Sequence, residues 1–538
     1  MKIALTFSGG GYRAAAFGLG ALSYLHKINI GSKTLLEHIS VLSTVSGGTI
    51  TGARYAIGIK RNENFDTTYK SLYSFLAKTD LIDLACEKLS SDSNWDEKRV
   101  RNLINSFADI YDEHLFHHAK FGEIMNDAID CHLKHISFNA TEFANALQFR
   151  FQWSERILNS KDGDPERAII GNYYYNIPHD TAKEIRMADI MAASSCFPGG
   201  FEPVNFPDDF VLNNEHQTLF SNQKYPVGLM DGGIVDNQGL EPVLLAEKRM
   251  QHNNSATNQE TPVQNLIDLI IICDVASPYM ESYQASQQNK SEWWKHLTPY
   301  SILYINKILF LLGLIGLPLS FYKNAMLGAI ACTIVLTITT IIFCFAKLVR
   351  YAIVNSELPT EFFDHLTKLL KLKLFIFQNL FVNRFKSILQ LSLTVFLKHV
   401  RRLNYNVIYK DSKWQNRRIM CALHELNIGD QTLQKKQQNG KLPDWLLPSH
   451  KLQEVVEQAS KMGTTLWFTN EDLQEKNMLN ILIACGQFTM CWNLLEYINN
   501  IKSDPTNINA EHLQLIQYEQ TLRQHWEAFK SNPLFMLD

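Results

Sequence analysis

The amino-acid sequence predicts an α/β fold with a largely parallel central sheet, interrupted by a pair of apolar helices. Short apolar runs at 2–7, 39–45 and 266–273 have the composition of strands that are covered on both faces. These runs are followed by Ser8, Ser46 and Asp274. Helical patterns separate the runs, as in folds that layer helices on a sheet. Near residue 293 the composition changes abruptly to long stretches almost without charge.

Length and composition limit the possible classes of protein. A chain of 538 residues is expected to form two or three structural units. Hydrophobic residues make up 46% and the net charge is −3, which excludes a disordered chain and gives no global electrostatic argument for nucleic-acid binding. The nine cysteines show no metal-ligand spacing, so we expect reduced thiols in a protein that faces the cytosol. The first residues also lack the pattern of a secretory signal.

The first fifty residues contain the most informative stretch. A strand at Lys2–Phe7 runs into the glycine-rich turn SGGGYR at 8–13, and a helix is predicted at Ala14–Lys27. A second strand at Ile39–Val45 ends at Ser46, and small residues from Gly48 onward continue as a helix. Backbone N–H groups in a glycine turn, together with a serine at a strand-to-helix corner, are the two halves of an acyl-transfer site.

Further elements follow along the chain. The patterns predict helices within 62–116, two strands joined by a turn at 135–151, a strand at 168–175, a helix at 187–197, strands at 225–230 and 266–273, and helices within 459–498. The strand at 225–230 presents Asp231 at its end. Functional groups at strand ends are typical of parallel α/β sheets.

Two apolar segments predict a transmembrane hairpin. Residues 301–322 contain one charge, Lys307, and residues 325–346 contain none. A helix that crosses a bilayer needs about 20 apolar residues. The alternative is a buried helical pair in a large soluble core. Segment length and the missing charges favour the membrane.

A basic stretch follows the hairpin at 365–402. It contains no Asp or Glu and interleaves aromatic residues with eight cations: Lys368, Lys371, Lys373, Arg384, Lys386, Lys398, Arg401 and Arg402. This composition is typical of helices on an anionic membrane surface. An amphipathic helix facing water would explain the periodicity but not the lack of acids, and nucleic-acid binding fits poorly with so many apolar residues. We therefore predict a catalytic domain at 1–285, a membrane-associated insertion at 286–404, and a helical part at 405–538 that completes the catalytic domain.

Three strings, each after a strand, resemble the signatures of patatin-like phospholipases, and are most similar to the branch of cytosolic group IV phospholipases. They are SGGGYRAA from Ser8, TVSGGT around Ser46, and MDGG around Asp231. The segments FNATEF at 138–143 and AASSCFPGGFEPV at 192–204 resemble the family as well. The resemblance implies the family's three-layer fold, with a mostly parallel sheet in the middle layer.

The resemblance also implies a Ser–Asp dyad. Ser46 would attack the ester carbonyl of a lipid, and Asp231 would accept its proton and later activate water. The N–H groups of Gly10 and Gly11 would bind the oxyanion. The remaining matched positions have supporting parts: Gly9 would shape the turn, Gly47 supplies a small residue beside the nucleophile, and Arg13 could meet the lipid phosphate or brace the loop.

One position departs from the family pattern. Thr44 replaces the first glycine of the usual Gly-x-Ser-x-Gly elbow, which puts the geometry of that elbow in question. Each site residue also has a simpler interpretation. Ser46 could cap a helix, Asp231 could be a turn residue, and Arg13 could be structural. The order of the three motifs favours catalytic roles for Ser46 and Asp231 and leaves Arg13 open.

The resulting prediction is a membrane-anchored serine lipid acyl hydrolase of the phospholipase A or lysophospholipase type, with its catalytic domain facing the cytoplasm. We expect a phospholipid or another lipid acyl ester as substrate, an anionic membrane as partner, and no nucleic acid, cofactor or metal. An acyltransferase and an idle lipid-binding scaffold are the alternatives. A dinucleotide-binding protein is less favoured, because the glycine pattern at 9–14 is followed by a second strand without the acidic residue that holds ribose.

Overall fold

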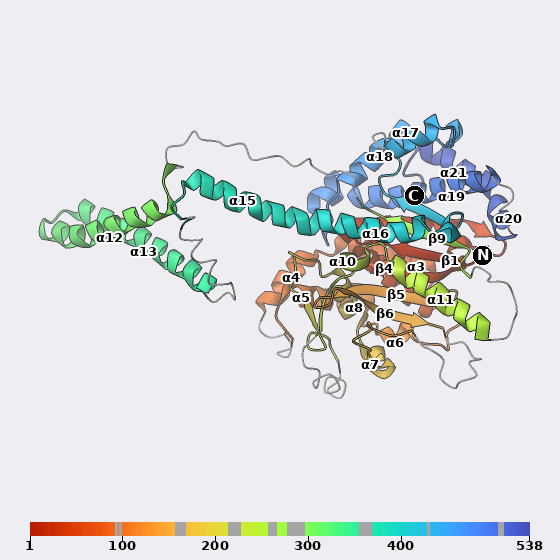
Figure 1. Ribbon diagram of the computed structural model, residues 1–538, viewed down its shortest axis with the longest axis horizontal. Helices are drawn as coiled ribbons and strands as arrows, with labels where there is room; N and C mark the ends of the chain where they lie inside the picture. Colours follow the sequence, from red (N-terminus) through yellow and green to blue (C-terminus); the bar gives the residue numbers. More distant parts are fainter. Residues whose placement is uncertain are drawn as a thin grey trace. The chain divides into compact units, whose positions relative to one another are not determined.

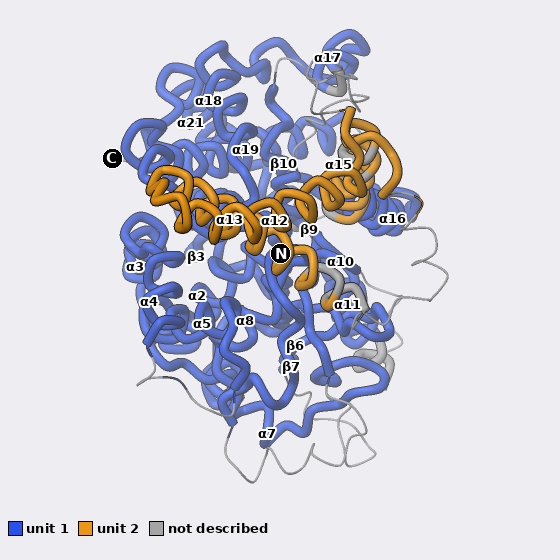
Figure 2. Tube along the Cα trace, turned by 90° about the vertical axis from the view of Figure 1, so that its left-hand side faces the viewer, with its two compact units in different colours: residues 1–280, 393–538 blue, residues 281–392 orange. Residues whose placement is uncertain are grey.

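The computed structural model describes residues 1–91, 95, 99–155, 168–212, 227–256, 266–276, 296–354, 368, 370–427, 431–503 and 510–537. The predicted strand start at 225–226 and parts of the predicted segments, 277–285 and 365–367, lie outside these ranges. The chain divides into two compact units, Met1–Met280 with Leu393–Asp538, and Glu281–Ser392 (Figure 2).

The first unit is built on a sheet of eight strands (Figure 1). Its strands are β1 (Ile3–Phe7), β4 (Ile39–Val45), β5 (His135–Glu142), β6 (Leu147–Ser154), β7 (Val204–Phe206), β8 (Val227–Asp231), β9 (Leu269–Asp274) and β10 (Arg418–Ala422). Their order is β10-β9-β1-β4-β5-β8-β7, with β6 also paired to β5. The pairs from β10 to β5 are parallel, whereas β6, β7 and β8 pair antiparallel. The predicted α/β class with a mostly parallel sheet is confirmed.

The alternation of side chains along the strands produces three layers. Leu5 and Ile271 belong to one apolar cluster, while Ala4 and Ile270 belong to another on the opposite face. The first cluster includes residues of α1 (Gly11–Lys27), α2 (Gly47–Lys60), α8 (Met187–Ser195) and α19 (Met478–Ser503). The second includes residues of α11 (Leu240–Ala256) and α16 (Leu397–Tyr409). Strands covered on both faces are therefore apolar throughout, as the sequence indicated.

The remaining elements of this unit are mostly helices. They are the strands β2 (Asn29–Ile30) and β3 (Lys33–Thr34), and the helices η1 (Leu35–His38), α3 (Phe65–Lys78), α4 (Leu81–Ser90), α5 (Leu103–Tyr111), η2 (Asp112–Phe116), α6 (Phe121–Ile124), α7 (His179–Glu184), α10 (Gly233–Asp236), η5 (Ser412–Trp414), α17 (Gln431–Gln438), η6 (Asp444–Leu446), α18 (His450–Lys461), η7 (Glu471–Glu475), α20 (Ala510–Ile516) and α21 (Glu519–Ser531).

The predicted strand at 168–175 is wrong. Only isolated bridges occur there, from Gly171 to Arg150 and to Asn176. Gly171 adopts a φ of +119°, and the Asn172 side chain accepts hydrogen bonds from the N–H groups of Tyr174 and Tyr175. A side-chain turn of this kind satisfies backbone donors that a strand would need for its ladder.

The C-terminal part completes the sheet and its helical cover. β10 pairs with β9, and α19 packs along α1. The two helices approach closely because both carry glycine at the contact. A Cβ on Gly20 would lie 2.0 Å from the carbonyl oxygen of Ile483, and one on Gly486 would lie 2.1 Å from that of Phe17. Residues more than 450 positions apart thus share one core.

The second unit contains α12 (Pro299–Tyr322), α13 (Met326–Val354) and α15 (Leu374–Gln390). A π-helical segment, η4 (Leu391–Phe396), links α15 to α16 along the chain. Helices α12 and α13 pack together, and Asn306, which is 3% exposed, donates to the carbonyl oxygen of Thr339 at 3.2 Å. Gly313 faces Leu336 across the same contact. Most large apolar side chains of the pair, such as Leu312 and Ile334, are exposed.

Three described helices are long and apolar enough to cross a membrane: Pro299–Tyr322, Met326–Leu348 and Met478–Ser503. The first two contain the predicted segments 301–322 and 325–346 almost entirely, and only 11% of the most apolar window of each is buried. The third is α19, and 94% of its most apolar window is buried inside the first unit. Its apolar composition is accounted for by packing in that core.

Candidate active site

The turn that carries Ser46 joins β4 to α2. Ser46 adopts φ 51° and ψ −127°, a conformation that is costly for a residue with a side chain. The turn is packed directly against the glycine-rich loop. A Cβ on Gly47 would lie 2.0 Å from the carbonyl oxygen of Gly11, and one on Gly48 would lie 2.7 Å from that of Ser8. Only glycine fits at these two positions, which brings the Ser46 turn and the loop into contact.

A chain of hydroxyl groups holds this strained turn. The Ser46 N–H donates to Ser194 Oγ at 2.9 Å, and Ser194 Oγ donates to the carbonyl oxygen of Asn139 at 2.7 Å. Thr49 Oγ1 lies 3.0 Å from Ser194 Oγ and 3.0 Å from Thr44 Oγ1. Ser194 belongs to the AASSCFPGG segment on α8, so this segment supports the nucleophile through its backbone.

The same contacts explain how threonine replaces the first glycine of the elbow. Thr44 directs Oγ1 to Thr49 and its methyl group toward Gly52, where an added Cβ would lie only 2.3 Å from Thr44 Cγ2. The glycine needed for close approach is therefore found on α2 instead of β4. The departure from the family pattern is compensated within the same turn.

Asp231 lies at the end of β8, beside Ser46. Its Oδ1 accepts a hydrogen bond from the Gly233 N–H at 2.7 Å, and its carboxyl group also interacts with the Ser46 hydroxyl. Burial raises the pKa of Asp231 to about 6, although the bonds from Ser46 and Gly233 lower it in part. The structure thus brings the predicted serine and aspartate together.

The glycine-rich loop lies against the same serine. A Cβ on Gly9 would be 3.1 Å from Ser46 Cβ, and the Gly9 N–H donates to the carbonyl oxygen of Asn237 at 3.1 Å. Gly10 and Gly11 have φ of +150° and +59°. Within the described residues, the N–H groups of these two glycines have no acceptor. They are the donors available to a developing oxyanion, and α1 begins at Gly11 with its positive end toward them.

These groups line one pocket of about 420 Å³. Its apolar lining includes Phe197, Pro198, Ile234, Leu397 and Leu466. The pocket is also lined by three cationic residues, Arg13, Lys398 and Arg401. Arg13 is 6% exposed and donates to the carbonyl oxygen of Met462 at 2.7 Å, so it braces the loop against the C-terminal part. Burial, and then the charge of Arg401, lower the pKa of Arg13 to about 10.

Four residues near this pocket were not predicted from the sequence to belong to the site. Asn237 and Ser194 hold the backbone of Gly9 and Ser46, and Lys398 and Arg401 line the pocket from α16. Arg401 also pairs with Asp274 at 3.3 Å. The only sequence signal for the two cations was the acid-free basic stretch, and that pattern indicates a membrane surface equally well. Ser194 was contained in a family-like segment but carried no signal of its own.

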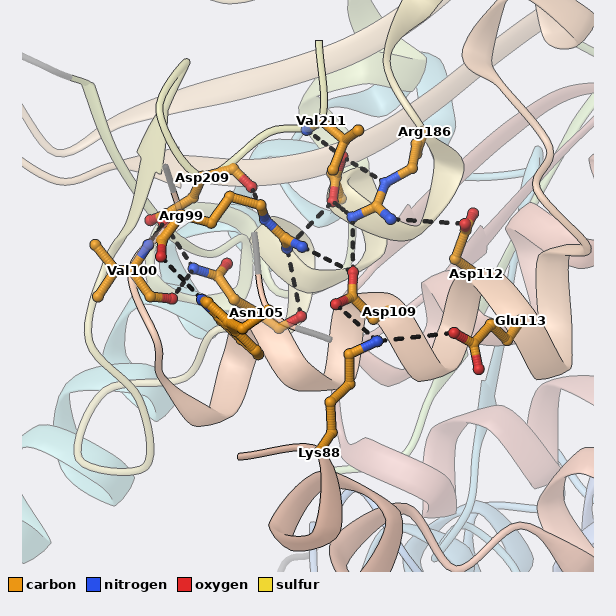
Figure 3. Close-up of polar contacts among 12 residues, drawn as sticks. Lys88, Arg99, Val100, Asn105, Asp109, Asp112, Glu113, Arg186, Asp209 and Val211 are labelled. Carbon is orange, nitrogen blue, oxygen red and sulfur yellow. Dashed lines mark hydrogen bonds and ion pairs between the residues drawn. The ribbon is translucent and has the colours of Figure 1, made fainter. Parts of the chain in front are cut away.

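A network of largely buried ion pairs links α8, the helix that carries Ser194, to its neighbours (Figure 3). Arg186 pairs with Asp189 at 2.6 Å and with Asp109 of α5 at 3.1 Å, and Arg99 pairs with Asp109 at 2.8 Å. Burial alone would lower the pKa of Arg186, but the carboxylates of Asp189, Asp109 and Asp112 outweigh it and raise the pKa. The network joins α5 to α8.

Within the described ranges, no three His, Cys, Asp or Glu side chains gather as metal ligands would.

Comparison with known proteins gives a family match. A family model described as patatin-like phospholipase matches residues 5–244, which include the glycine loop, Ser46 and Asp231. No curated protein matches the chain. Residues of the three motifs within this match line one pocket. Residues 5–244 form a patatin-like phospholipase domain.

Proposed function

We propose that this protein is a membrane-anchored serine lipid acyl hydrolase of the phospholipase A or lysophospholipase type. The family of residues 5–244 implies lipid ester substrates. The observation that carries the proposal is that Ser46, Asp231, Gly10 and Gly11 line one pocket, where the Ser46 hydroxyl is among the groups that lower the pKa of Asp231. The closer relation to cytosolic group IV phospholipases remains a prediction.

In this mechanism, Ser46 Oγ attacks the ester carbonyl while Asp231 accepts the hydroxyl proton. The N–H groups of Gly10 and Gly11 stabilise the oxyanion, and the proton returns to the leaving alcohol. An acyl-Ser46 intermediate remains. Asp231 then takes a proton from water, which attacks the acyl group; the bond to Ser46 Oγ breaks, the proton passes from Asp231 to Ser46 Oγ, and a fatty acid is released. A carboxyl group with a pKa of about 6 is mostly ionised at neutral pH and basic enough to accept a proton without a histidine.

The anchor is assigned to α12 and α13. Their exposed surface is apolar, while the polar Asn306 is turned toward the partner helix. This is the arrangement that a lipid environment favours. Two crossings return the chain to the side it left. The basic residues after the hairpin support a cytosolic location for that side and an anionic lipid surface as its partner.

The proposal is tested by incubating membranes with the wild-type protein and with Ser46→Ala, followed by lipid mass spectrometry. Free fatty acid and the matching deacylated lipid should appear with the wild type and be lost in Ser46→Ala. Ser90→Ala, which alters an exposed serine of α4, serves as the matched control and should behave as wild type. Transfer of the acyl chain to a second lipid would identify an acyltransferase. If the folded wild-type protein leaves the lipids unchanged, the remaining interpretation is a lipid-binding scaffold without catalytic activity.

A further inference from the structure

The wall of the pocket formed by α16 is firmly attached to the catalytic strand. Asn404 of α16 donates to the carbonyl oxygen of Val235 at 2.8 Å and to Asp236 Oδ1 at 3.3 Å. Both acceptors lie on α10, which begins two residues after Asp231. At the other end of α16, Ile408 is fully buried in the apolar cluster against the sheet. Lys398 and Arg401 are thus held at the pocket by contacts independent of their charges.

The charges at this wall are incompletely balanced. Asp274 pairs with Arg401, but within the described part of the chain neither Arg13 nor Lys398 has an ion-pair partner. The three cations are close enough to disfavour one another. After burial, Arg401 is the next cause that lowers the pKa of Arg13 and of Lys398. Among the described residues that line the pocket or pair with its lining, Asp231 and Asp274 are the only carboxylates. Such a cluster favours a bound anion.

Hydrogen-bond donors also remain unused. Arg13 Nε and Arg401 Nε are buried and have no acceptor among the described residues. A buried donor without an acceptor costs stability, and an entering oxyanion removes that cost. The tetrahedral oxygens of a phosphate group can accept from two guanidinium groups and an ammonium group together, whereas a carboxylate offers only two oxygens.

We propose that Lys398 and Arg401, with Arg13, form a subsite for the phosphate group of a glycerophospholipid whose ester is cleaved at Ser46. This inference rests on the proposed function and narrows its substrate class. In such a lipid the phosphate lies a few bonds from the scissile ester, so both must enter one pocket. The two α16 cations lie outside residues 5–244 and come from the helix that follows the inserted unit. The subsite rejects uncharged acyl esters because these leave the buried donors unpaired.

The test compares two substrates with the same acyl chains, a phosphatidylcholine and a diacylglycerol, in mixed detergent micelles. Lys398→Gln and Arg401→Gln should each lower kcat/KM for the phospholipid about ten- to a hundredfold more than for the diacylglycerol, as expected for a lost charge-assisted hydrogen bond. The loss should appear mainly in KM. Arg402→Gln removes the adjacent, exposed cation that does not line the pocket, and should keep the wild-type ratio. Lys398→Gln keeps the Arg401–Asp274 pair, so its result does not depend on that contact.

Equal losses on both substrates, or an unchanged preference in Lys398→Gln and Arg401→Gln, would overturn the subsite. Adding inorganic phosphate tests whether the cations bind free phosphate instead of the phosphate group of a lipid. If phosphate changes hydrolysis of p-nitrophenyl butyrate while the lipid preference is insensitive to both substitutions, the cations bind free phosphate and the headgroup assignment is wrong. Hydrolysis that persists in Ser46→Ala overturns the proposed function instead, since that outcome does not depend on Lys398 or Arg401.

Discussion

At the residue scale, Asp231 is a carboxylate in an environment where its ionised form is unfavourable. Asp231 is 7% exposed, and two hydrogen bonds only partly offset the effect of burial on its pKa. The raised pKa makes Asp231 a better base at neutral pH. The same shift has a cost, because a folded protein with an ionised, buried Asp231 is less stable than one in which that group is neutral.

Asp231→Asn should abolish hydrolysis and, above pH 7, stabilise the fold. The folded-state pKa of about 6 lies above the ordinary value of 3.8, so the stabilisation from a protonated Asp231 is complete below pH 3.8 and is lost as pH rises through 6. Asparagine, which is neutral throughout, should gain at most about 3 kcal/mol at pH 8, at about 1.4 kcal/mol per pKa unit. Thermal unfolding followed by tryptophan fluorescence, at pH 8 and pH 4.5, measures this difference.

The wild-type protein supplies the companion measurement. Because the base must be unprotonated, kcat/KM for a soluble ester should rise with pH and level off above about 6. A rate that is flat from pH 5 to 8 would contradict the role of Asp231. So would a stability difference between wild type and Asp231→Asn of the same size at both pH values.

At the element scale, the elbow shows how β4 and α2 share one steric requirement. The methyl group of Thr44 occupies the space that Gly52 leaves open one turn into the helix. Both elements are predicted from the sequence, and the bounds of β4 match the predicted 39–45. The compensation is not predictable in this way, because nothing in the local pattern pairs Thr44 with Gly52.

Gly52→Ala should destabilise the protein by about 1–3 kcal/mol, the usual cost of overpacking a filled core. Thr44→Ser removes Cγ2 but keeps the hydroxyl that contacts Thr49. The double variant Thr44→Ser/Gly52→Ala should therefore be more stable than Gly52→Ala alone. A thermodynamic cycle from urea unfolding of the four proteins gives the coupling. Strictly additive effects would show that these two positions do not compete for space.

Other elements show why prediction from sequence was incomplete. The five-residue β10 was not predicted, since it is short and its partner β9 lies far away in the sequence. The three-residue β7 was missed for the same reason of length. Apolar composition alone also cannot separate α19 from α12, because both meet the requirements of a membrane span and only packing distinguishes them.

At the scale of the whole molecule, the two units differ in where their apolar side chains lie. We call 281–392 the inserted unit and 1–280 with 393–538 the catalytic unit. Exposed leucines and isoleucines cover α12 and α13, whereas the first unit buries its apolar side chains around the sheet. The inserted unit ends at Ser392, so α16 belongs to the catalytic unit, although its first residues continue the basic stretch predicted at 365–402. The cations of one continuous sequence pattern are thus divided between two units. No local pattern reveals that division.

Removing residues 299–354, the hairpin of α12 and α13, should release the protein from membranes that retain the full chain after alkaline carbonate extraction. The two ends of an antiparallel helical pair lie near each other, so a short flexible linker can replace it. Because α16 and the pocket stay intact, hydrolysis of p-nitrophenyl butyrate should change less than about threefold, as expected for a substitution remote from the site. A deletion that extends to 402 removes Lys398 and Arg401 and is the matched comparison.

Retention of the shortened protein in the carbonate pellet would contradict the anchor. Complete loss of ester hydrolysis in a folded protein that lacks only 299–354 would show that the hairpin is required for the catalytic unit itself.

The backing of the glycine loop has a consequence for biosynthesis. The Tyr12 N–H donates to the carbonyl oxygen of Thr465 at 2.8 Å, and Arg13 is held by Met462. A ribosome makes the loop first and its support more than 400 residues later, after the hairpin has emerged. Under the proposed function, we therefore expect the nascent chain to be inert during most of translation and to hydrolyse lipids only after the hairpin has reached the bilayer.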